Sequence, residues 1–242
     1  MNVLIVIPTY NERDNIASLI PEIFRVFGEN AIRGSVLVVD DNSPDGTGDA
    51  VKALGNTYEV SLIARPGKLG LGSAYTEGFR TAFKTADVIF QMDADFSHDP
   101  KEIPNFIKGL KDSDVVVGSR YTAGGRTENW GISRKVISRA GNLIAKTFLG
   151  LRLNDVTTGY RAYRTPVLES IDLDSIKSNG YSFLVELLFY VSRKGFRIKE
   201  TPIVFRDRTQ GKSKLSQMEI LYFFLTCWRL FVGERLIGAL KK

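Results

Sequence analysis

The chain has 242 residues, of which 43% are hydrophobic and 25% charged, enough for a sizeable core in one large domain or two small ones. Its net charge of +6 favours an anionic partner, such as a nucleotide, a nucleic acid or an acidic lipid surface, without choosing among them. The one cysteine, Cys227, excludes a disulfide within the chain. No apolar run reaches the roughly 18 residues of a transmembrane helix, and the first residues lack the features of a signal peptide, so we expect neither.

Short runs rich in valine and isoleucine alternate with helical patterns along the chain. The runs are typical of strands buried on both faces and lie at residues 3–7, 36–39, 60–64, 88–92 and 115–117. The helical patterns lie at residues 15–27, 72–84 and 101–111. This alternation predicts an α/β fold with a doubly wound, mostly parallel sheet and flanking helices. We expect a single domain over residues 1–216, followed by an amphipathic helix over residues 217–242.

Polar or charged residues follow each predicted strand. These segments are residues 8–12, 40–43, 65–68, 93–95 and 118–120. A polar strand end taken alone is most often a solvated turn. In open α/β sheets, however, ligands bind beyond the carboxyl ends of the strands, where these five segments converge. The pattern therefore predicts a binding crevice at that edge of the sheet.

The glycine pattern argues against two common nucleotide-binding folds. A Rossmann dinucleotide site has G-x-G-x-x-G after its first strand, where this chain has the glycine-free IPTYNE. Glycines do follow the third strand, at residues 67–72, but with a different spacing. No Walker A sequence is present. A hydride-transfer enzyme and a P-loop NTPase are therefore disfavoured.

The fourth predicted strand ends in two aspartates one residue apart, Asp93 and Asp95. Mg²⁺ prefers oxygen ligands, commonly one or two carboxylates completed by substrate phosphates and water. The pair predicts a divalent-metal site at which a nucleotide diphosphate supplies further ligands. The alternative is an Asx-turn with solvated acids. For His98, the only histidine, we favour a turn or helix entry over the role of a distant metal ligand.

Six segments occur in a fixed order along the chain: IPTYNE, VVDDNSPDGT, DADFSHDP, GSRY, TTGYR and RDRTQGKSKL. Together they resemble the family-two glycosyltransferases of GT-A fold, and the resemblance covers residues 3–216. Within that family they are similar to the short dolichol-phosphate mannose synthases, which lack transmembrane segments. The resemblance implies an inverting transfer of mannose from GDP-mannose to dolichyl phosphate or another polyprenyl phosphate, with Mg²⁺ or Mn²⁺ as the cofactor.

The resemblance also implies roles for particular residues. The implied nucleotide-sugar site comprises Pro8, Tyr10, Glu12, Val39, Asp41, Asp93, Ala94, Asp95, Arg120, Arg208 and Lys214. Asp93 and Asp95 are the implied metal ligands, and Asp95 and Arg208 are the expected catalytic residues. Some relatives have glutamine at the position of Ser97, so we expect water to replace that third metal ligand here.

A phosphate acceptor removes the need for a general base. The second pKa of a phosphate monoester is about 6, so near pH 7 the group is largely a dianion and already nucleophilic. It needs positive charge to hold it, and we expect Arg134, Arg208 and Lys214 to bind it. Arg208 is the first choice because a planar guanidinium can bind two phosphate oxygens. A solvated basic loop is the alternative for residues 206–214, and Asp155 is a candidate base that the chemistry does not demand.

The C-terminal segment has a helical pattern with a broad apolar face. Its narrow polar stripe consists of Glu219, Tyr222, Thr226, Arg229 and Gly233. Such a helix lies in a membrane interface, or it packs on the core or on a partner. With a prenyl substrate, we expect a cytoplasmic protein, peripheral on the cytosolic face of a membrane; in the resembled family, small membrane subunits can supply anchoring. Residues 122–132, with three glycines, predict a loop near the phosphates that orders when the donor binds.

Other functions stay open at this level. The residues alone do not distinguish a guanine from a uracil nucleotide. The nearest alternative is therefore a glucosyl- or N-acetylhexosaminyltransferase that uses a UDP-sugar. A non-catalytic subunit that binds a sugar nucleotide or a lipid is the second. Nucleic-acid binding is disfavoured, because the positive residues cluster at strand ends and in one loop rather than along a reading helix.

Overall fold

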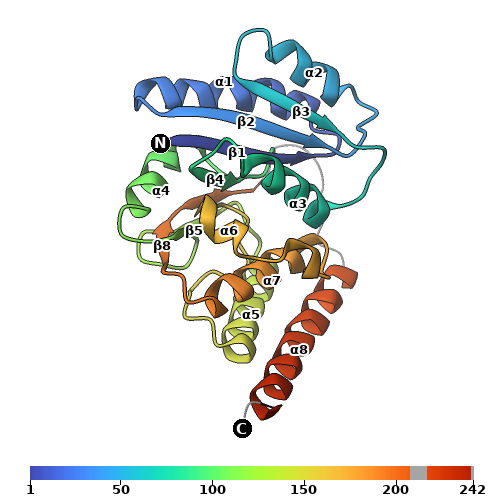
Figure 1. Ribbon diagram of the computed structural model, residues 1–242, viewed down its shortest axis with the longest axis vertical. Helices are drawn as coiled ribbons and strands as arrows, with labels where there is room; N and C mark the ends of the chain where they lie inside the picture. The colour runs from blue at the N-terminus through green and yellow to red at the C-terminus, as the bar shows by residue number, and fades with distance from the viewer. Residues whose placement is uncertain (208–216, 241–242) are drawn as a thin grey trace.

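The computed structural model describes residues 1–207 and 217–240, and these residues build a seven-stranded sheet covered by helices (Figure 1). The strand order is β3-β2-β1-β4-β7-β5-β8, and β7 alone runs antiparallel to its neighbours. The strands are β1 (Asn2–Thr9), β2 (Arg33–Asp40), β3 (Val60–Ala64), β4 (Val88–Gln91), β5 (Val115–Ser119), β7 (Arg161–Arg164) and β8 (Ile198–Pro202). The mostly parallel α/β fold expected from the sequence is therefore confirmed.

Helices cover both faces of the sheet. They are α1 (Arg13–Glu29), α2 (Thr47–Leu54), α3 (Leu71–Ala82), α4 (Ile103–Gly109), α5 (Ile132–Leu149), α6 (Thr165–Glu169), α7 (Gly180–Arg193) and α8 (Gln217–Leu240). Short 3₁₀ turns lie at Pro100–Glu102 and Leu173–Ser175. The three helical patterns expected from the sequence correspond to α1, to α3, and to α4 with the turn before it.

Two hydrophobic cores lie on opposite faces of the sheet. In β1, Val3, Ile5 and Ile7 belong to one core and Leu4 and Val6 to the other, as the period of two in a strand requires. The first core is closed by α1, α2 and α4, and the second by α3, α6 and α7 with parts of α5 and α8. Because β1 is buried on both faces, it reads in the sequence as a continuous apolar run.

One expected loop contains a strand. Within residues 122–132, β6 (Arg126–Glu128) pairs in parallel with β9 (Val204–Arg206) to form a small second sheet. Just before β6 the chain passes so close to the end of β5 that only glycine fits at position 125, since a Cβ there would lie 2.3 Å from the carbonyl oxygen of Ser119. The sequence did not reveal this strand, because its three polar residues form no apolar run; the ordering of the loop on donor binding stays a prediction.

Helix α8 extends along one side of the molecule, away from the sheet (Figure 1). Its buried residues Phe223, Cys227 and Leu230 join the second core. Across the residues that the structure describes, α8 included, we find no helix with the length and apolar content needed to span a bilayer.

Candidate functional site

Backbone strain gathers at three neighbouring strand ends. Asn11 follows β1, Asn42 follows β2 and Phe96 follows β4, with φ angles of +58°, +56° and +60°. Asparagine tolerates this left-handed region, whereas a bulky residue such as phenylalanine rarely enters it. Such strain is retained mainly where a site requires a particular backbone path. The three strained positions lie at the edge of the sheet where the sequence predicts the crevice.

The two aspartates after β4 differ in environment. Asp93 has a side chain 33% exposed and lines a cavity of about 290 Å³, and its Oδ1 accepts a hydrogen bond from the Tyr75 hydroxyl at 3.2 Å. Asp95 is buried, and its Oδ1 accepts hydrogen bonds from the backbone N–H and the hydroxyl of Ser97, at 3.1 and 2.6 Å. The Asx-turn considered as an alternative thus forms at Asp95, and it engages one of the two carboxylate oxygens.

The donor set suits a hard cation that takes most of its ligands from a substrate. Among the described residues, no group of three or more His, Cys, Asp or Glu side chains is placed to hold a metal ion. Two aspartates, however, match Mg²⁺ sites that use one or two carboxylates plus phosphate oxygens and water. Asp93 and Asp95 fit such an ion when a diphosphate is bound beside them.

His98 supports the turn rather than standing free as a ligand. It is buried, its ring stacks on Tyr160 with centroids 4.8 Å apart, and its Nδ1 accepts the backbone N–H of Asp93 at 2.9 Å. Burial lowers the pKa of His98, and the nearby Asp93 carboxylate only partly offsets this. In a neutral ring whose Nδ1 accepts, Nε2 carries the proton, and Nε2 lies 3.9 Å from Asp93 Oδ2.

The residues expected around the nucleoside lie together at the ends of β1 and β2. Pro8 and Tyr10 are half-buried, and the Lys68 ammonium lies 4.1 Å from the centroid of the Tyr10 ring. Glu12 accepts a hydrogen bond from the Asn15 side chain at 2.7 Å. Lys68 was not proposed as a site residue from the sequence. The structure adds it to the candidate site, because its ammonium lies over the Tyr10 ring.

Three other expected residues are enclosed by the fold. The Val39 and Ala94 side chains belong to the hydrophobic cores, so only their backbone atoms are open to a nucleotide. Asp41 is also buried; its Oδ1 lies 2.6 Å from Arg65 Nη1, and its Oδ2 accepts the Gly70 N–H at 2.9 Å. Asp41 therefore fixes the loop after β3, and its contact with a nucleoside stays a prediction.

Two arginines line the same cavity as Asp93. Arg120 follows β5 and is buried, whereas Arg134 lies in the first turn of α5 and is half-buried. Arg134 Nη1 lies 2.7 Å from both carboxylate oxygens of Asp207, and its guanidinium carbon is 4.2 Å from the centroid of the Trp130 ring. Arg208 and Lys214, the other two expected phosphate ligands, lie outside the described residues.

Asp155, considered above as a base, is fully buried and paired with Arg120. Its Oδ2 lies 2.6 Å from Arg120 Nε, and its Oδ1 lies 2.7 Å from Arg120 Nη2. Burial alone would raise the pKa of Asp155, but the Arg120 charge and hydrogen bonds outweigh it and hold the pKa below its usual value. A carboxylate so placed has no exposed oxygen with which to take a proton from an acceptor.

The remaining lining of the cavity is apolar and comes mainly from two helices. Ile137, Ala140 and Gly141 belong to α5, while Phe223 and Phe224 belong to α8. The cavity thus brings two acidic side chains, Asp93 and Glu219, together with two arginines and a hydrophobic wall. This combination suits an amphiphile with a charged head, and sequence reasoning missed it because the helical pattern of α5 was not identified.

A mostly parallel α/β sheet, with paired aspartates after β4 and two arginines lining the adjoining cavity, is the arrangement expected of a glycosyltransferase of GT-A type. Residues 4–172 match glycosyl transferase family 2, and the chain belongs to this family.

Two bacterial relatives are similar over most of their length. The chain is 45% identical over 218 residues to the undecaprenyl-phosphate mannosyltransferase of Micrococcus luteus, covering 89% of this chain and 88% of that one. It is 40% identical over 221 residues to the polyprenol monophosphomannose synthase of Mycolicibacterium smegmatis, covering 90% and 82%.

Solved structures confirm the fold at lower identity. The glucosyl-3-phosphoglycerate synthase of Mycobacterium tuberculosis, in complex with phosphoglyceric acid, matches with a TM-score of 0.68 and 18% identity, over 93% of this chain and 80% of that one. A mannosyltransferase of Pyrobaculum calidifontis, in complex with GDP-mannose and Mn²⁺, matches with a TM-score of 0.62 and 20% identity, over 87% of this chain and 58% of that one. At such identities the likeness concerns the fold alone.

Proposed function

We propose that the chain transfers mannose from GDP-mannose to a polyprenyl phosphate such as dolichyl phosphate, with inversion, forming polyprenyl-phosphate mannose and GDP. The observation that carries this proposal is the cavity in which Asp93, Arg120 and Arg134 meet the apolar sides of α5 and α8. The names of the two bacterial relatives support the same donor sugar and the same class of acceptor.

The acceptor phosphate binds between Arg120 and Arg134, so the proposal moves Arg120 from the nucleotide-sugar site that the resemblance implied to the acceptor side of the cavity. Both side chains lie beside Trp130, with guanidinium carbons 5.2 and 4.2 Å from the centroid of its ring, so the phosphate is held by positive charge on an apolar support. Because a phosphate dianion is already nucleophilic, these arginines need only orient it. Arg208 and Lys214 add to this charge in the proposal and await a test by substitution.

The donor binds across the ends of β1, β2 and β4. Tyr10 and Lys68 lie at the nucleoside side and Asp93 at the diphosphate side of this arrangement. Asp93 and Asp95 would hold a Mg²⁺ or Mn²⁺ ion, which when bound neutralises charge on the departing diphosphate. The Tyr75 hydroxyl and the turn at Ser97 fix the directions of these two carboxylates. Asp95 and Arg208 are the proposed catalytic residues.

Helix α8 packs on the protein with most of its polar stripe as well as with part of its apolar face. Three members of the polar stripe face the protein: Glu219 accepts the Tyr181 N–H at 3.3 Å, Thr226 is 2.9 Å from Ser178 Oγ, and Arg229 is 2.7 Å from the buried Glu186. The exposed large side chains are Met218, Leu221, Tyr222, Phe224, Leu225 and Trp228.

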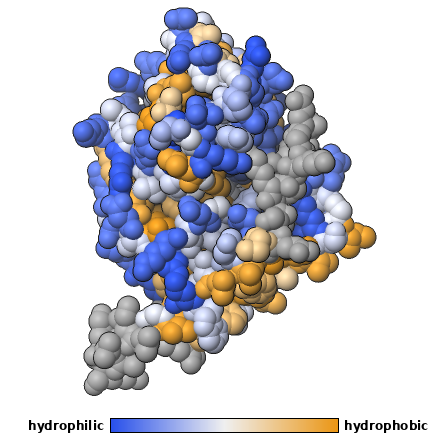
Figure 2. Space-filling model, turned by 90° about the vertical axis from the view of Figure 1, so that its right-hand side faces the viewer, coloured by the Kyte–Doolittle hydropathy of each residue, from blue (hydrophilic) through white to orange (hydrophobic). Residues whose placement is uncertain are grey.

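Helix α5 adds to this apolar surface. Ile132, Val136 and Leu143 are exposed on it, and the helix has basic residues but no acidic ones. Figure 2 shows a band of hydrophobic residues across the lower part of the molecule, where α8 lies. An apolar surface flanked by basic residues suits an anionic membrane surface. Our proposal is therefore a peripheral protein on the cytosolic face of a membrane, whether or not a small membrane subunit assists it.

A transfer assay tests the function. We expect radiolabelled mannose to pass from GDP-mannose into a lipid that organic solvent extracts, when polyprenyl phosphate and Mg²⁺ or Mn²⁺ are present. Thermal-shift measurements with Mn²⁺ should show stronger stabilisation by GDP than by UDP. Preferential stabilisation by UDP would replace the donor with a UDP-sugar, and binding of both substrates without product under either metal would favour a non-catalytic subunit.

A further inference from the structure

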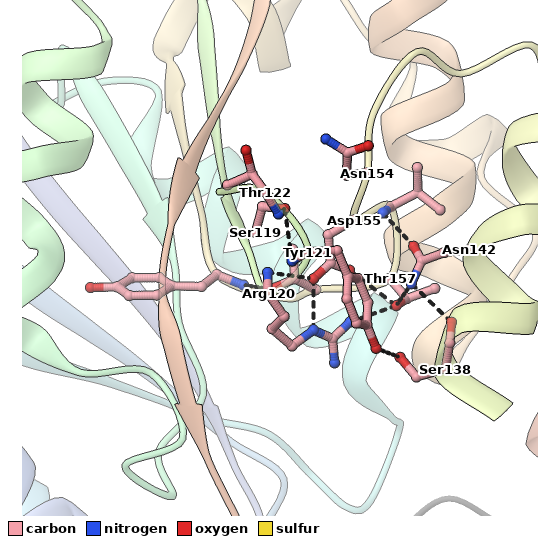
Figure 3. Close-up of polar contacts among 12 residues, drawn as sticks. Ser119, Arg120, Tyr121, Thr122, Ser138, Asn142, Asn154, Asp155 and Thr157 are labelled. Carbon is pink, nitrogen blue, oxygen red and sulfur yellow. Dashed lines mark hydrogen bonds and ion pairs between the residues drawn. The ribbon is translucent and has the colours of Figure 1, made fainter. Parts of the chain in front are cut away.

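Arg120 donates three hydrogen bonds to the Asp155 carboxylate, and Thr157 donates a fourth. Asp155 Oδ2 accepts from Arg120 Nε at 2.6 Å and from the Arg120 backbone N–H at 3.0 Å. Asp155 Oδ1 accepts from Arg120 Nη2 at 2.7 Å and from the Thr157 hydroxyl at 3.3 Å. An ionised carboxylate has about four lone-pair positions, so this one is fully used (Figure 3).

Asp155 is itself fixed by a buried network from two other elements. The Asp155 N–H donates to Glu200 of β8 at 2.9 Å. Asn142 of α5 accepts the Val156 N–H at 2.7 Å and donates to the Thr157 hydroxyl at 3.2 Å. The Thr157 hydroxyl also accepts from Arg120 Nη2 at 2.7 Å, so its one donor and two acceptor positions are all satisfied. The carboxylate therefore has one orientation.

The geometry leaves one guanidinium nitrogen for a ligand. Nε and Nη2 of Arg120 are bound to Asp155 and Thr157, and among the described residues Nη1 has no hydrogen-bond partner. The Trp130, Tyr121 and Phe205 rings surround this guanidinium, with centroids 5.2 to 5.4 Å from its central carbon. Arg120 is 7% exposed and lines the cavity that Asp93 and Arg134 share.

We propose that Asp155 is a positioning residue, which fixes Arg120 so that its Nη1 edge presents hydrogen-bond donors to the acceptor phosphate. The inference rests on the proposed function, because it takes a prenyl phosphate as the ligand of the cavity. It replaces the role of a base with one exerted through Arg120 alone. Positioning matters because a buried arginine without a carboxylate would turn toward whatever acceptor it could reach, and the phosphate would lose a preorganised partner.

A double-mutant cycle tests this. Asp155→Asn presents an amide NH₂ to the Arg120 donors, so at least one hydrogen bond is lost. We expect Arg120→Gln and Asp155→Asn each to raise the KM for polyprenyl phosphate about 10- to 100-fold, the effect of losing a charged hydrogen bond, with the KM for GDP-mannose nearly unchanged. The double variant should match Arg120→Gln within about threefold, because Asp155 then has no arginine to position.

The double variant also protects the test against misfolding. If either single variant fails to fold because the remaining buried charge has lost its partner, the neutral Gln–Asn pair of the double variant avoids that cost, and its KM for polyprenyl phosphate should show the same rise of about 10- to 100-fold. A double variant at least tenfold less active than Arg120→Gln would overturn the proposal, because Asp155 would then act independently. An unchanged acceptor KM in folded Asp155→Asn would also overturn it, whatever happens to kcat.

The chain offers a matched control. Asp114, just before β5, binds Arg197 with the same pattern: the backbone N–H at 2.9 Å, and Nε and Nη2 at 3.3 Å each. This pair lies at the opposite end of the strand, away from the cavity. Asp114→Asn should leave both KM values unchanged; a rise in the acceptor KM there would show that any broken pair on β5 perturbs the site and would overturn a specific role for Asp155.

Binding without turnover separates this inference from the proposed function. In a Trp228→Phe background, Trp130 is the only tryptophan and reports on the cavity by fluorescence. Titration with a short-chain prenyl phosphate should change the signal, and Asp155→Asn should weaken that binding. If the prenyl phosphate binds in this way but no mannose is transferred, the proposed function fails and the positioning role stands; if Asp155→Asn binds as tightly as the parent, the positioning role fails.

Discussion

At the scale of single residues, carboxylates paired with arginines decide which groups in the site are free to act. Asp41 is bound by Arg65, and Asp155 by Arg120. The resemblance implied that Asp41 lies in the nucleotide-sugar site, and the sequence offered Asp155 as a candidate base. It could not show that each is engaged by an arginine 24 or 35 positions away, since such pairings depend on the packing of separate strands.

The pH dependence of transfer follows from the absence of an enzymatic base. Protonation of the acceptor dianion to the monoanion weakens the nucleophile, so kcat/KM for the acceptor should fall as pH drops through about 6, the second pKa of a phosphate monoester. Asp155, whose pKa Arg120 holds below its usual value, stays ionised through this range.

A comparison of acceptors checks this assignment. An acceptor phosphonate or phosphate with a different second pKa should move the inflection by the same amount. An inflection that stays at one pH for both acceptors belongs instead to a group on the protein and contradicts the account without a base.

At the scale of elements, the first five strands of the main sheet were predictable and the later ones were not. Strands β1 to β5 are apolar runs, whereas β7 has the sequence RAYR and includes the fully buried Arg161. Two of the three guanidinium nitrogens of Arg161 donate to the carbonyls of Leu184 and Val156, at 2.6 and 2.9 Å, which supports the side chain in its core position. A strand of this kind leaves no hydrophobic pattern in the sequence.

The attachment of α8 to α7 depends on a buried charge. Glu186 of α7 has no exposed side-chain surface, and it binds Arg229 of α8 at 2.7 Å and the Ser178 N–H at 3.0 Å. Arg229→Met removes the counter-charge, so we expect the free energy of unfolding to fall by about 1–3 kcal/mol; this is less than a fully buried pair would lose, because the Arg229 side chain is 39% exposed.

Urea denaturation of Arg229→Met measures this loss. Glu186→Gln combined with Arg229→Met should recover part of it, because the double variant leaves no unpaired buried charge. Arg25→Met, which breaks only two surface ion pairs on α1, with Glu22 and Glu29, should cause little change. A loss from Arg229→Met no larger than that from Arg25→Met would mean that the pair does not hold α8.

At the scale of the whole molecule, one side is built for a water-soluble nucleotide and another for an apolar phase. The sequence identified an amphipathic C-terminal helix but not which face it exposes. Periodicity shows which residues lie on the polar and apolar faces, but not which of these faces packs on the protein. The structure turns the polar stripe toward residues 178–186 and leaves the apolar residues of α8 beside those of α5. The cavity lies between these helices and the end of the sheet, so a prenyl chain can remain in the membrane while its phosphate reaches the site.

Substitutions on the outer face of α8 test this arrangement without touching the cavity. Leu221, Leu225 and Trp228 are 48%, 54% and 57% exposed, and none of them lines the cavity. Replacing all three by serine should weaken binding to anionic vesicles at least about 100-fold, since each inserted side chain contributes roughly 1.5–3 kcal/mol when fully buried in an apolar phase. Vesicle flotation measures the binding, and transfer to a polyprenyl phosphate embedded in the vesicles should fall with it.

A short-chain prenyl phosphate dissolved in water provides the comparison. It reaches the cavity without a membrane, so the triple variant should transfer mannose to it at the rate of the parent protein. If the variant binds vesicles as well as the parent does, the exposed face of α8 instead covers a protein, and a membrane subunit becomes its partner. If transfer to the short-chain acceptor falls as well, the outer face supports the fold of the site, because a surface that only contacts lipid cannot alter a reaction in solution.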